Sequence, residues 1–338
     1  MGKLKIYIPF LCFMNTACAT NTSKICQKSN PEVIEQLNKV YYGKNKIRIF
    51  YTTQGDNAIK DKTDHNQNNI PDYIENIAIQ TETVMQAWDA LGYQNPLQSP
   101  RYKSAKYIDI HIQKLSGLGI AYSKAHLHTN NPLKENKCAL IISLSNNITN
   151  FTTQSSVAAH ELFHLYIYGY TMFKPKWLNE GLAAWSEGII RKGKTGAYGD
   201  KDLPKTKKEL EQDFLQRSYQ ASKVWSSITI LTDQSNGKLL LPNNILEKKY
   251  TDGQPVFQDH YLKGTIFIQK FLQNLGKEDK HLSKTNHWQP YSWKDSTQKS
   301  QIYNKNIISV LLKSLENNSV PENNQNILFE SLLKQQTE

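Results

Sequence analysis

The hydrophobic positions in the first half of the chain follow three patterns. Apolar and polar residues alternate in Ile47–Thr53 and Tyr107–Gln113, which is the two-residue period of a β-strand. Cys138–Leu144 is an almost continuous apolar run, typical of a strand buried on both faces or of the strand at the edge of a cleft. In Pro31–Tyr42 and Asp72–Leu91 the apolar residues have helical spacing, so we expect amphipathic helices there.

Beyond Gly188 the chain becomes more polar and its apolar spacing is helical. The clearest predicted helices are Glu209–Ile230, Gly264–Leu275, Ile302–Leu315 and Ile327–Leu333, of which we expect the last two to pack together. The fold class is therefore α+β. We expect a mixed sheet with helices in residues 20–190 and a mainly helical lobe in residues 191–338.

The stretch Ser155–Gly188 contains the most specific chemistry. His160, Glu161 and His164 form an H-E-x-x-H sequence within a predicted helix that starts near Ser155 or Ser156 and closes at Gly169. Residues four apart lie one above the other on a helix, so both imidazoles can reach one metal ion. The alternative interpretation is that both histidines are core residues whose ring nitrogens are hydrogen-bonded within the protein.

A second helix is predicted from Lys176 to about Ile190, and it offers the remaining groups of a metal site. A catalytic zinc ion usually has three protein ligands, and Glu180 is the candidate for the third. Glu161 is then the candidate general base. Asn179 and Glu187 are candidates for orienting an imidazole or the ligand carboxylate from outside the ligand set.

Met1–Ala19 has the pattern of an export signal. Two lysines precede a short apolar run, and Ala17-Cys18-Ala19 offers small residues for cleavage before Thr20. Acylation of Cys18 as a lipoprotein is the alternative. No other stretch is long and apolar enough to insert into a membrane, so we expect a periplasmic or secreted protein.

Export would place the remaining cysteines in an oxidising compartment. Cys26 and Cys138 are the two that follow the signal, and an oxidising compartment favours a disulfide between them. Two buried free thiols are the alternative. The formal net charge is +11, but its lysines lie in polar surface stretches without interleaved aromatic residues. We therefore expect no nucleic-acid partner. No feature of the sequence indicates an oligomeric state.

Asp64–Glu75 has the spacing of a calcium-binding loop. Oxygen-bearing side chains occur at positions one, three, five, nine and twelve, and position seven supplies a backbone carbonyl. Asn69 stands at position six, where a left-handed turn is needed. The candidate calcium ligands are Asp64, Asn66, Asn68, Ile70, Asp72 and Glu75. An Asn-rich turn that precedes a helix is the alternative.

These motifs together resemble a known family. Y-T-T-x-G at Tyr51–Gly55, the loop at Asp64–Glu75, H-E-x-x-H and W-x-x-E-G-x-A-x-W-x-E resemble secreted bacterial zinc metallopeptidases of the gluzincin type. The likeness covers Tyr41 to about Gly188 and implies zinc on His160, His164 and Glu180. The G-x-M-E-N segment of the aminopeptidase N branch is absent, so an exopeptidase of that branch is not expected.

Tyr261 completes the expected site. Tyr261-Leu262-Lys263-Gly264 is similar to the Y-x-K-G segment of aminopeptidase N-type gluzincins, whose tyrosine stabilises an oxyanion. An aromatic residue that merely packs is the alternative. The expected activity is hydrolysis of a peptide or protein substrate. The competing interpretations are a non-catalytic secreted protein that binds calcium or zinc, and a zinc hydrolase that acts on a non-peptide amide.

Overall fold

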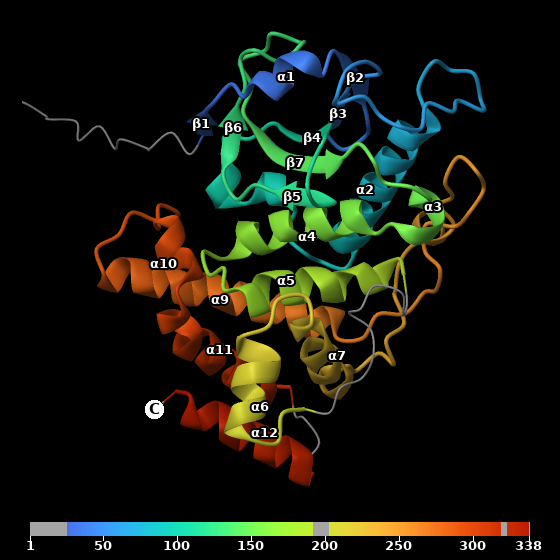
Figure 1. Ribbon diagram of the computed structural model, residues 1–338. Coiled ribbons are helices and arrows are strands. Elements are labelled where there is room, and N and C mark those ends of the chain that lie inside the picture. Colours follow the sequence, from blue (N-terminus) through green and yellow to red (C-terminus); the bar gives the residue numbers. More distant parts are fainter. Residues whose placement is uncertain (1–25, 192–202, 319–322, 338) are drawn as a thin grey trace, which may run out of the picture.

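The computed structural model describes residues 26–191, 203–318 and 323–337. The predicted signal segment 1–19, with Cys18, lies outside these ranges. The described chain forms a β-sheet with helices packed against it and further helices stacked in layers below (Figure 1). The expected α+β class with a mixed sheet is confirmed.

Seven strands form one sheet in the order β1-β6-β7-β4-β3-β2, and β5 also pairs with β7. β3, β4 and β7 are parallel, whereas β2 runs antiparallel to β3, and β5 and β6 run antiparallel to β7. The strands are β1 (Cys26–Lys28), β2 (Lys39–Tyr42), β3 (Ile47–Tyr51), β4 (Tyr107–Gln113), β5 (Gly119–Ala121), β6 (Ala125–Leu127) and β7 (Ala139–Ser145).

Most helices lie on one side of this sheet and fill the lower part of the molecule, whereas the first helix lies on the other side (Figure 1). The helices are α1 (Glu32–Gln36), α2 (Asp72–Ala90), α3 (Phe151–Gln154), α4 (Val157–Tyr170), α5 (Lys176–Ser186), α6 (Lys207–Glu209), α7 (Ala221–Thr232), α8 (Asn243–Leu246), α9 (Thr265–Thr285), α10 (Asp295–Lys299), α11 (Asn304–Glu316) and α12 (Asn324–Gln335).

The central strands agree with their sequence patterns. Every residue of β7 is buried, as its continuous apolar run predicts. The alternative that this run forms the edge of a cleft is wrong, because β7 lies between β4 on one side and β5 and β6 on the other. The strand next to the candidate site is β5, a three-residue segment that the hydrophobic pattern did not predict.

The helix predicted at Pro31–Tyr42 is wrong in its second half. α1 stops after one turn, because Leu37 has the non-helical dihedrals φ −81° and ψ 71°. The residues that follow form β2, in which Val40 pairs with Phe50 of β3. Aromatic and β-branched side chains suit a strand, and pairing with the sheet edge outweighs the weak helical spacing of such a short segment.

One continuous cluster of buried apolar side chains joins the sheet to the helices, and it reaches from Ile47 of β3 to Leu333 of α12. α2 and α4 pack against each other, and α4 contacts β5 and β7. α2 ends as expected, because Gly92 beyond it adopts a left-handed φ of 84°. No helix in the described ranges is at once long enough and apolar enough to cross a bilayer.

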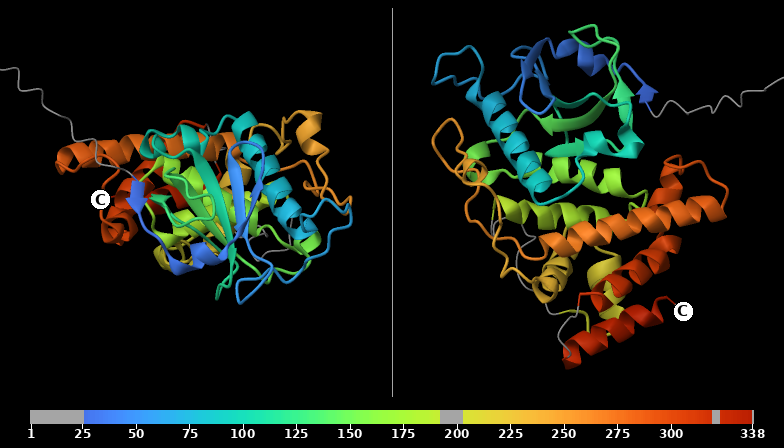
Figure 2. Two further views of the ribbon diagram at one scale, coloured as in Figure 1. Left: turned by 90° about the horizontal axis from the view of Figure 1, so that it is seen from above. Right: turned by 180° about the vertical axis from the view of Figure 1, so that it is seen from behind.

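The C-terminal helices pack beneath α4 and α5. The long helix α9 contacts α4, α7 and α11, and its course is clearest from behind (Figure 2). α11 and α12 contact each other, as the sequence predicted.

The single helix predicted at Glu209–Ile230 is wrong. The chain forms α6, a π-helical segment Leu210–Leu215 and, after a turn, α7. The aromatic packing gives the physical reason. Phe214 and Trp225 both pack on Trp177, at ring-centroid distances of 4.9 and 5.8 Å. In one straight helix residues eleven apart would lie about 16 Å apart along the axis. The break lets both rings meet on α5.

The predicted disulfide is confirmed. Cys26 and Cys138 are bonded, with their Cα atoms 6.1 Å apart, and the bond closes a span of 112 residues. It ties β1 at the start of the described chain to the beginning of β7. Because a cross-link over so long a span restricts the unfolded chain, a disulfide of this kind typically stabilises by about 2–4 kcal/mol.

Three histidines meet on the sheet face opposite α4. The rings of His111 and His126 each lie 5.5 Å from the ring of His128. Burial lowers the pKa of His111 well below its ordinary value and that of His128 to about 4. The folded protein therefore takes up these protons at a lower pH than the unfolded chain does, near pH 4 for His128 against about pH 6.5 for an unfolded histidine.

The contribution of this histidine cluster to stability is consequently expected to fall as the pH is lowered through this window. Between about pH 7 and pH 5 we expect a loss of about 1–2 kcal/mol for His128, because the unfolded state binds its proton first. Urea unfolding of the wild type and His128→Gln at both pH values measures this, and the variant should lose less stability. The exposed residue His281 gives the control, His281→Gln, which should behave as wild type. An equal loss in all three proteins would contradict the prediction.

Candidate metal centre

The H-E-x-x-H sequence lies in α4, which is buried along nearly its whole length. Ser156 is its N-cap residue, but the Ser156 hydroxyl donates a hydrogen bond to Glu187 and does not cap the helix. The expected stop at Gly169 is wrong, because the helix continues to Tyr170. The carbonyl oxygen of Gly169 accepts a hydrogen bond from Ser99, 2.7 Å away.

Two histidines and one glutamate come together between α4 and α5. The Nε2 atoms of His160 and His164 lie 3.5 and 3.4 Å from Oε2 of Glu180. The three potential ligand atoms all lie within 4.8 Å of one another, and in the described ranges no other group of His, Cys, Asp or Glu meets this condition. Ligands about 2.0–2.2 Å from a tetrahedral zinc ion are about 3.3–3.5 Å apart. The two distances to Glu180 fit that geometry.

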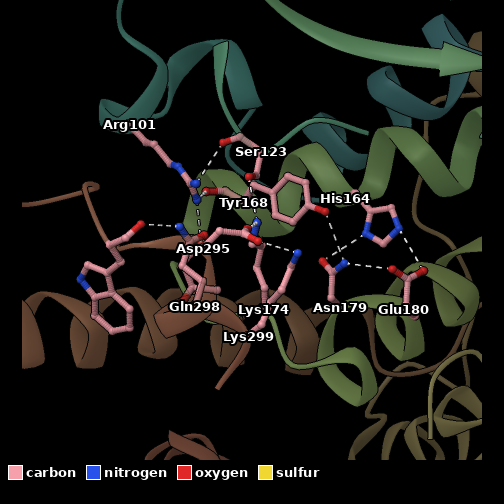
Figure 3. Close-up of polar contacts among 12 residues, drawn as sticks. Arg101, Ser123, His164, Tyr168, Lys174, Asn179, Glu180, Asp295, Gln298 and Lys299 are labelled. Carbon is pink, nitrogen blue, oxygen red and sulfur yellow. Dashed lines mark hydrogen bonds and ion pairs between the residues drawn. The ribbon is translucent and has the colours of Figure 1, made fainter. Parts of the chain in front are cut away.

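The other nitrogen of each imidazole is held by a polar side chain from the region of α5. Nδ1 of His160 lies 2.8 Å from Oε1 of Glu187, and Nδ1 of His164 lies 3.1 Å from Oδ1 of Asn179. Asn179 also donates to Glu180 at 3.2 Å (Figure 3). An acceptor at Nδ1 favours the tautomer whose Nε2 lone pair is available for a metal. The geometry therefore agrees with the predicted orienting roles of Asn179 and Glu187.

The acidic neighbours also govern the charge of this cluster. Burial lowers the pKa of His160, but hydrogen bonds to Glu180 and Glu187 outweigh it and raise the pKa to about 10. Burial raises the pKa of Glu180, yet hydrogen bonds to His160 and His164 hold it well below its ordinary value. The carboxylate therefore occupies the position of a ligand in its charged form. A metal cation on Nε2 requires neutral imidazole, so its binding displaces the His160 proton.

Glu161 points from α4 towards β5. Tyr122 donates its backbone N–H to Ile141 of β7, whereas the N–H of Ala121 points the other way and donates to the Glu161 carboxylate. A side chain at Gly119 would come within 2.7 Å of Glu161, so this close approach requires glycine. Burial raises the pKa of Glu161, although His164 and His160 oppose the shift. A raised carboxyl pKa suits a proton acceptor that later donates.

Tyr261 does not join this cluster and is absent from the residues that line the cavities beside it, so its predicted role has no support in this geometry. Its backbone pairs with Lys238, and the next residue donates to the carbonyl of Gly237. These contacts lie beyond the C-terminal end of α7. His160 faces the opposite, N-terminal end of α7. The two ends of this twelve-residue helix are about 18 Å apart.

Tyr219 is the tyrosine that lies at the candidate centre. It stands in the turn between the π-helical segment and α7, and its ring lies 5.6 Å from that of His160. Tyr219 is 55 % exposed, but partial desolvation of its hydroxyl, followed by the charges of Glu180 and Glu161, raises the pKa of Tyr219 to about 12, and the hydroxyl also hydrogen-bonds to Glu180. The hydroxyl is therefore a neutral donor at physiological pH. No local motif marked it, because the turn was predicted as helix.

Two cavities meet at this centre. The larger has a volume of about 690 Å³ and the smaller about 490 Å³. Gly119, Glu161 and Tyr219 line both of them. Among the described strands β5 pairs only with β7, so its other edge is open towards the two cavities. The site is thus a cleft that runs along β5 and passes the His160, His164 and Glu180 cluster.

The predicted calcium loop forms a turn stabilised by its own side chains. The Asp64 carboxylate accepts from the backbone N–H groups of Asn68 and Asn69, at 3.2 and 2.8 Å. The amides of Asn66 and Asn68 donate to Glu75, at 3.0 and 2.9 Å. Asn69 has the left-handed φ of 67° expected at position six. These are the hydrogen bonds of the Asn-rich turn that was the alternative interpretation.

Asp72, the ninth position of the loop, begins α2. One carboxylate oxygen lies 2.5 Å from Nδ1 of His65, and the other is buried without a hydrogen-bond partner. Ile70 follows Asn69, and its backbone N–H bonds to the side chain of Asn68. The loop therefore gathers the predicted oxygen ligands around one turn, and calcium binding stays a prediction.

Comparison with protein-family models, curated proteins and solved structures finds no match to this chain.

Proposed function

We propose that the protein is a zinc-dependent peptidase whose metal ion is held by His160, His164 and Glu180. The observation that carries the proposal is the spacing of the three ligand atoms, with each imidazole held at Nδ1 by a separate acceptor. The resemblance of the sequence to secreted gluzincins agrees with this ligand set, and export to the periplasm or medium forms part of the proposal.

When zinc is bound, it lowers the pKa of a water molecule and polarises the scissile carbonyl group. Glu161 is buried beside the ligands and lines both cavities. Its carboxylate would take a proton from the attacking water and pass it to the leaving amine. The open edge of β5 would bind the extended substrate backbone, because the backbone groups on that edge lack a strand partner. A peptide would thereby lie across Glu161.

Tyr219 would donate its hydroxyl proton in a hydrogen bond to the oxyanion of the tetrahedral intermediate. We expect Tyr219→Phe to lower kcat/KM by about 10- to 1,000-fold, because a single oxyanion donor contributes on this scale. Steady-state kinetics with a quenched-fluorescent peptide measure the loss, and mass spectrometry measures the zinc content of the variant. Tyr261→Phe is the matched control and should keep wild-type kinetics. Equal losses in both variants would contradict the assignment of Tyr219.

Zinc stoichiometry and peptide cleavage test the proposed function together. We expect one zinc ion per chain and cleavage of casein or a quenched-peptide library that a chelator abolishes and zinc restores. Zinc binding without cleavage of any peptide would instead indicate a non-catalytic binding protein. Cleavage confined to non-peptide amides or esters would indicate a different hydrolase. Absence of zinc binding would overturn the proposal.

We also propose that the Asp64–Glu75 loop binds calcium weakly, with a dissociation constant of about 0.1–1 mM. The buried oxygen of Asp72 that lacks a partner, and the left-handed Asn69, support this. Millimolar calcium is expected to raise the melting temperature because it binds the folded state. Differential scanning calorimetry with calcium and with magnesium measures the shift. Asp64→Asn should remove the calcium response, whereas an unchanged melting temperature in the wild type would exclude the site.

A further inference from the structure

The two ends of the cleft differ sharply in charge. The larger cavity is lined by four basic side chains, Lys174, Lys176, Arg217 and Lys299, and we call it the basic pocket. No lysine or arginine is found among the described residues that line the smaller cavity, whose charged groups are Glu161, Glu187 and the imidazole of His160. A substrate that lies along β5 therefore meets positive charge on only one side of Glu161.

Of the residues that the structure describes, four cationic side chains but only two carboxylates, those of Glu161 and Glu180, line the basic pocket itself. Lys174 and Lys299 share the single carboxylate of Asp295, at 2.9 and 2.6 Å (Figure 3). Arg217 is 3.4 Å from Asp213, and half of its side chain is exposed. Within the described chain Lys176 is exposed and forms no ion pair. At least one cation is thus available for an anionic group of a ligand.

The basic pocket is also fixed relative to the reacting centre. Lys174 is 8 % exposed, donates to the Ser123 hydroxyl at 2.9 Å and lies over the ring of Tyr168, which stacks on His164. Ser123 follows β5 two residues after Ala121, whose N–H bonds to Glu161. Two residues of extended chain span about 7 Å. A substrate side chain one to three residues from the scissile bond reaches this pocket.

We propose that the cleft selects peptides with aspartate or glutamate within three residues of the scissile bond, on the side that lies in the basic pocket. This inference rests on the proposed peptidase function and deepens it. The acidic side chain would pair with Lys176 and Arg217 at the pocket mouth, while Lys174 and Lys299 keep the local potential positive. Partly exposed ion pairs are screened by salt, so the preference should weaken as ionic strength rises.

A positional-scanning library of quenched-fluorescent peptides tests the preference. We expect the full-length wild type to cleave the best glutamate peptide about 5-fold faster in kcat/KM than its glutamine counterpart. Lys176→Gln and Arg217→Gln should each reduce that ratio by about 2- to 5-fold, as expected for partly exposed pairs. Lys176→Glu should favour lysine at the same position. Lys270→Gln, on the exposed side of α9, is the control for net charge and should keep the wild-type ratio.

A binding measurement separates this inference from the peptidase proposal. Zinc-loaded Glu161→Gln protein is titrated with the same glutamate, glutamine and lysine peptides by fluorescence anisotropy. Tighter binding of the glutamate peptide that is lost in high salt supports the basic pocket, even if the wild type cleaves nothing. Cleavage of the three peptides at equal rates overturns the proposed selectivity of the basic pocket but leaves the peptidase proposal standing. If the protein neither binds nor cleaves any of the peptides, both proposals are overturned.

Discussion

Replacing Glu161 by glutamine is expected to lower kcat for peptide hydrolysis by about 100- to 10,000-fold, which is the usual contribution of a positioned general base. Glutamine has almost the same shape as glutamate and fits beside Gly119, where there is no room for a larger group. Its carbonyl oxygen can still accept from the N–H of Ala121. What it loses is the ability to accept a proton at neutral pH.

The loss should appear in kcat and not in zinc binding. Because Glu161 lies outside the proposed ligand set, Glu161→Gln is expected to retain one zinc ion and the wild-type melting temperature. Steady-state kinetics, zinc analysis and calorimetry on the same preparation distinguish a catalytic defect from a folding defect. Glu209→Gln, in the short helix α6, is the matched control and should be fully active. Peptide cleavage by Glu161→Gln at the wild-type rate would contradict this mechanism.

The features that could be predicted from the sequence are local. The spacing of His160 and His164 is set by one helical turn, so their common direction follows from the geometry of α4 alone. Glu180 comes from the next helix, and a short connection keeps it near. The strand assignment of β4 was equally local, because its two-residue alternation matches the observed bounds Tyr107–Gln113.

The features that could not be predicted depend on contacts between distant segments. Tyr219 reaches His160 only because the chain breaks between the π-helical segment and α7, and that break follows from packing on Trp177 of α5. Periodicity favoured one unbroken helix there. Tyr261, by contrast, was chosen for a local motif, and its backbone pairs with Lys238 beyond the far end of α7.

The charge of the basic pocket has the same origin. Lys174 precedes α5, Lys176 begins it, Arg217 lies before α7, and Lys299 ends α10. In the sequence each is one lysine or arginine among many in a chain of net charge +11, so the overall charge indicates only a basic surface. Their convergence beside β5 exists only after these segments have packed together.

Removal of the Glu180 side chain is expected to have the largest effect on the metal. Glu180→Ala leaves two imidazoles as protein ligands, and we expect zinc affinity to fall by well over 100-fold. Glu187→Gln, which keeps an oxygen near Nδ1 of His160 but loses its charge, is the graded comparison. It should weaken binding by about 10- to 100-fold, the usual effect of losing such a partner of a ligand. Competition with a fluorescent zinc chelator measures both values.

Thermal unfolding gives an independent measure of the same hierarchy. Zinc at about 1,000 times its dissociation constant stabilises a folded protein by about 4 kcal/mol, so wild type should gain that amount at saturation. At the same zinc concentration Glu187→Gln should gain less, and Glu180→Ala almost nothing. The order follows from chemistry, because loss of a ligand removes a bond to the metal, whereas loss of its partner only reorients an imidazole. If Glu180→Ala kept the wild-type gain, the metal would have to be held by other groups, and the catalytic arrangement around Glu161 would lose its basis.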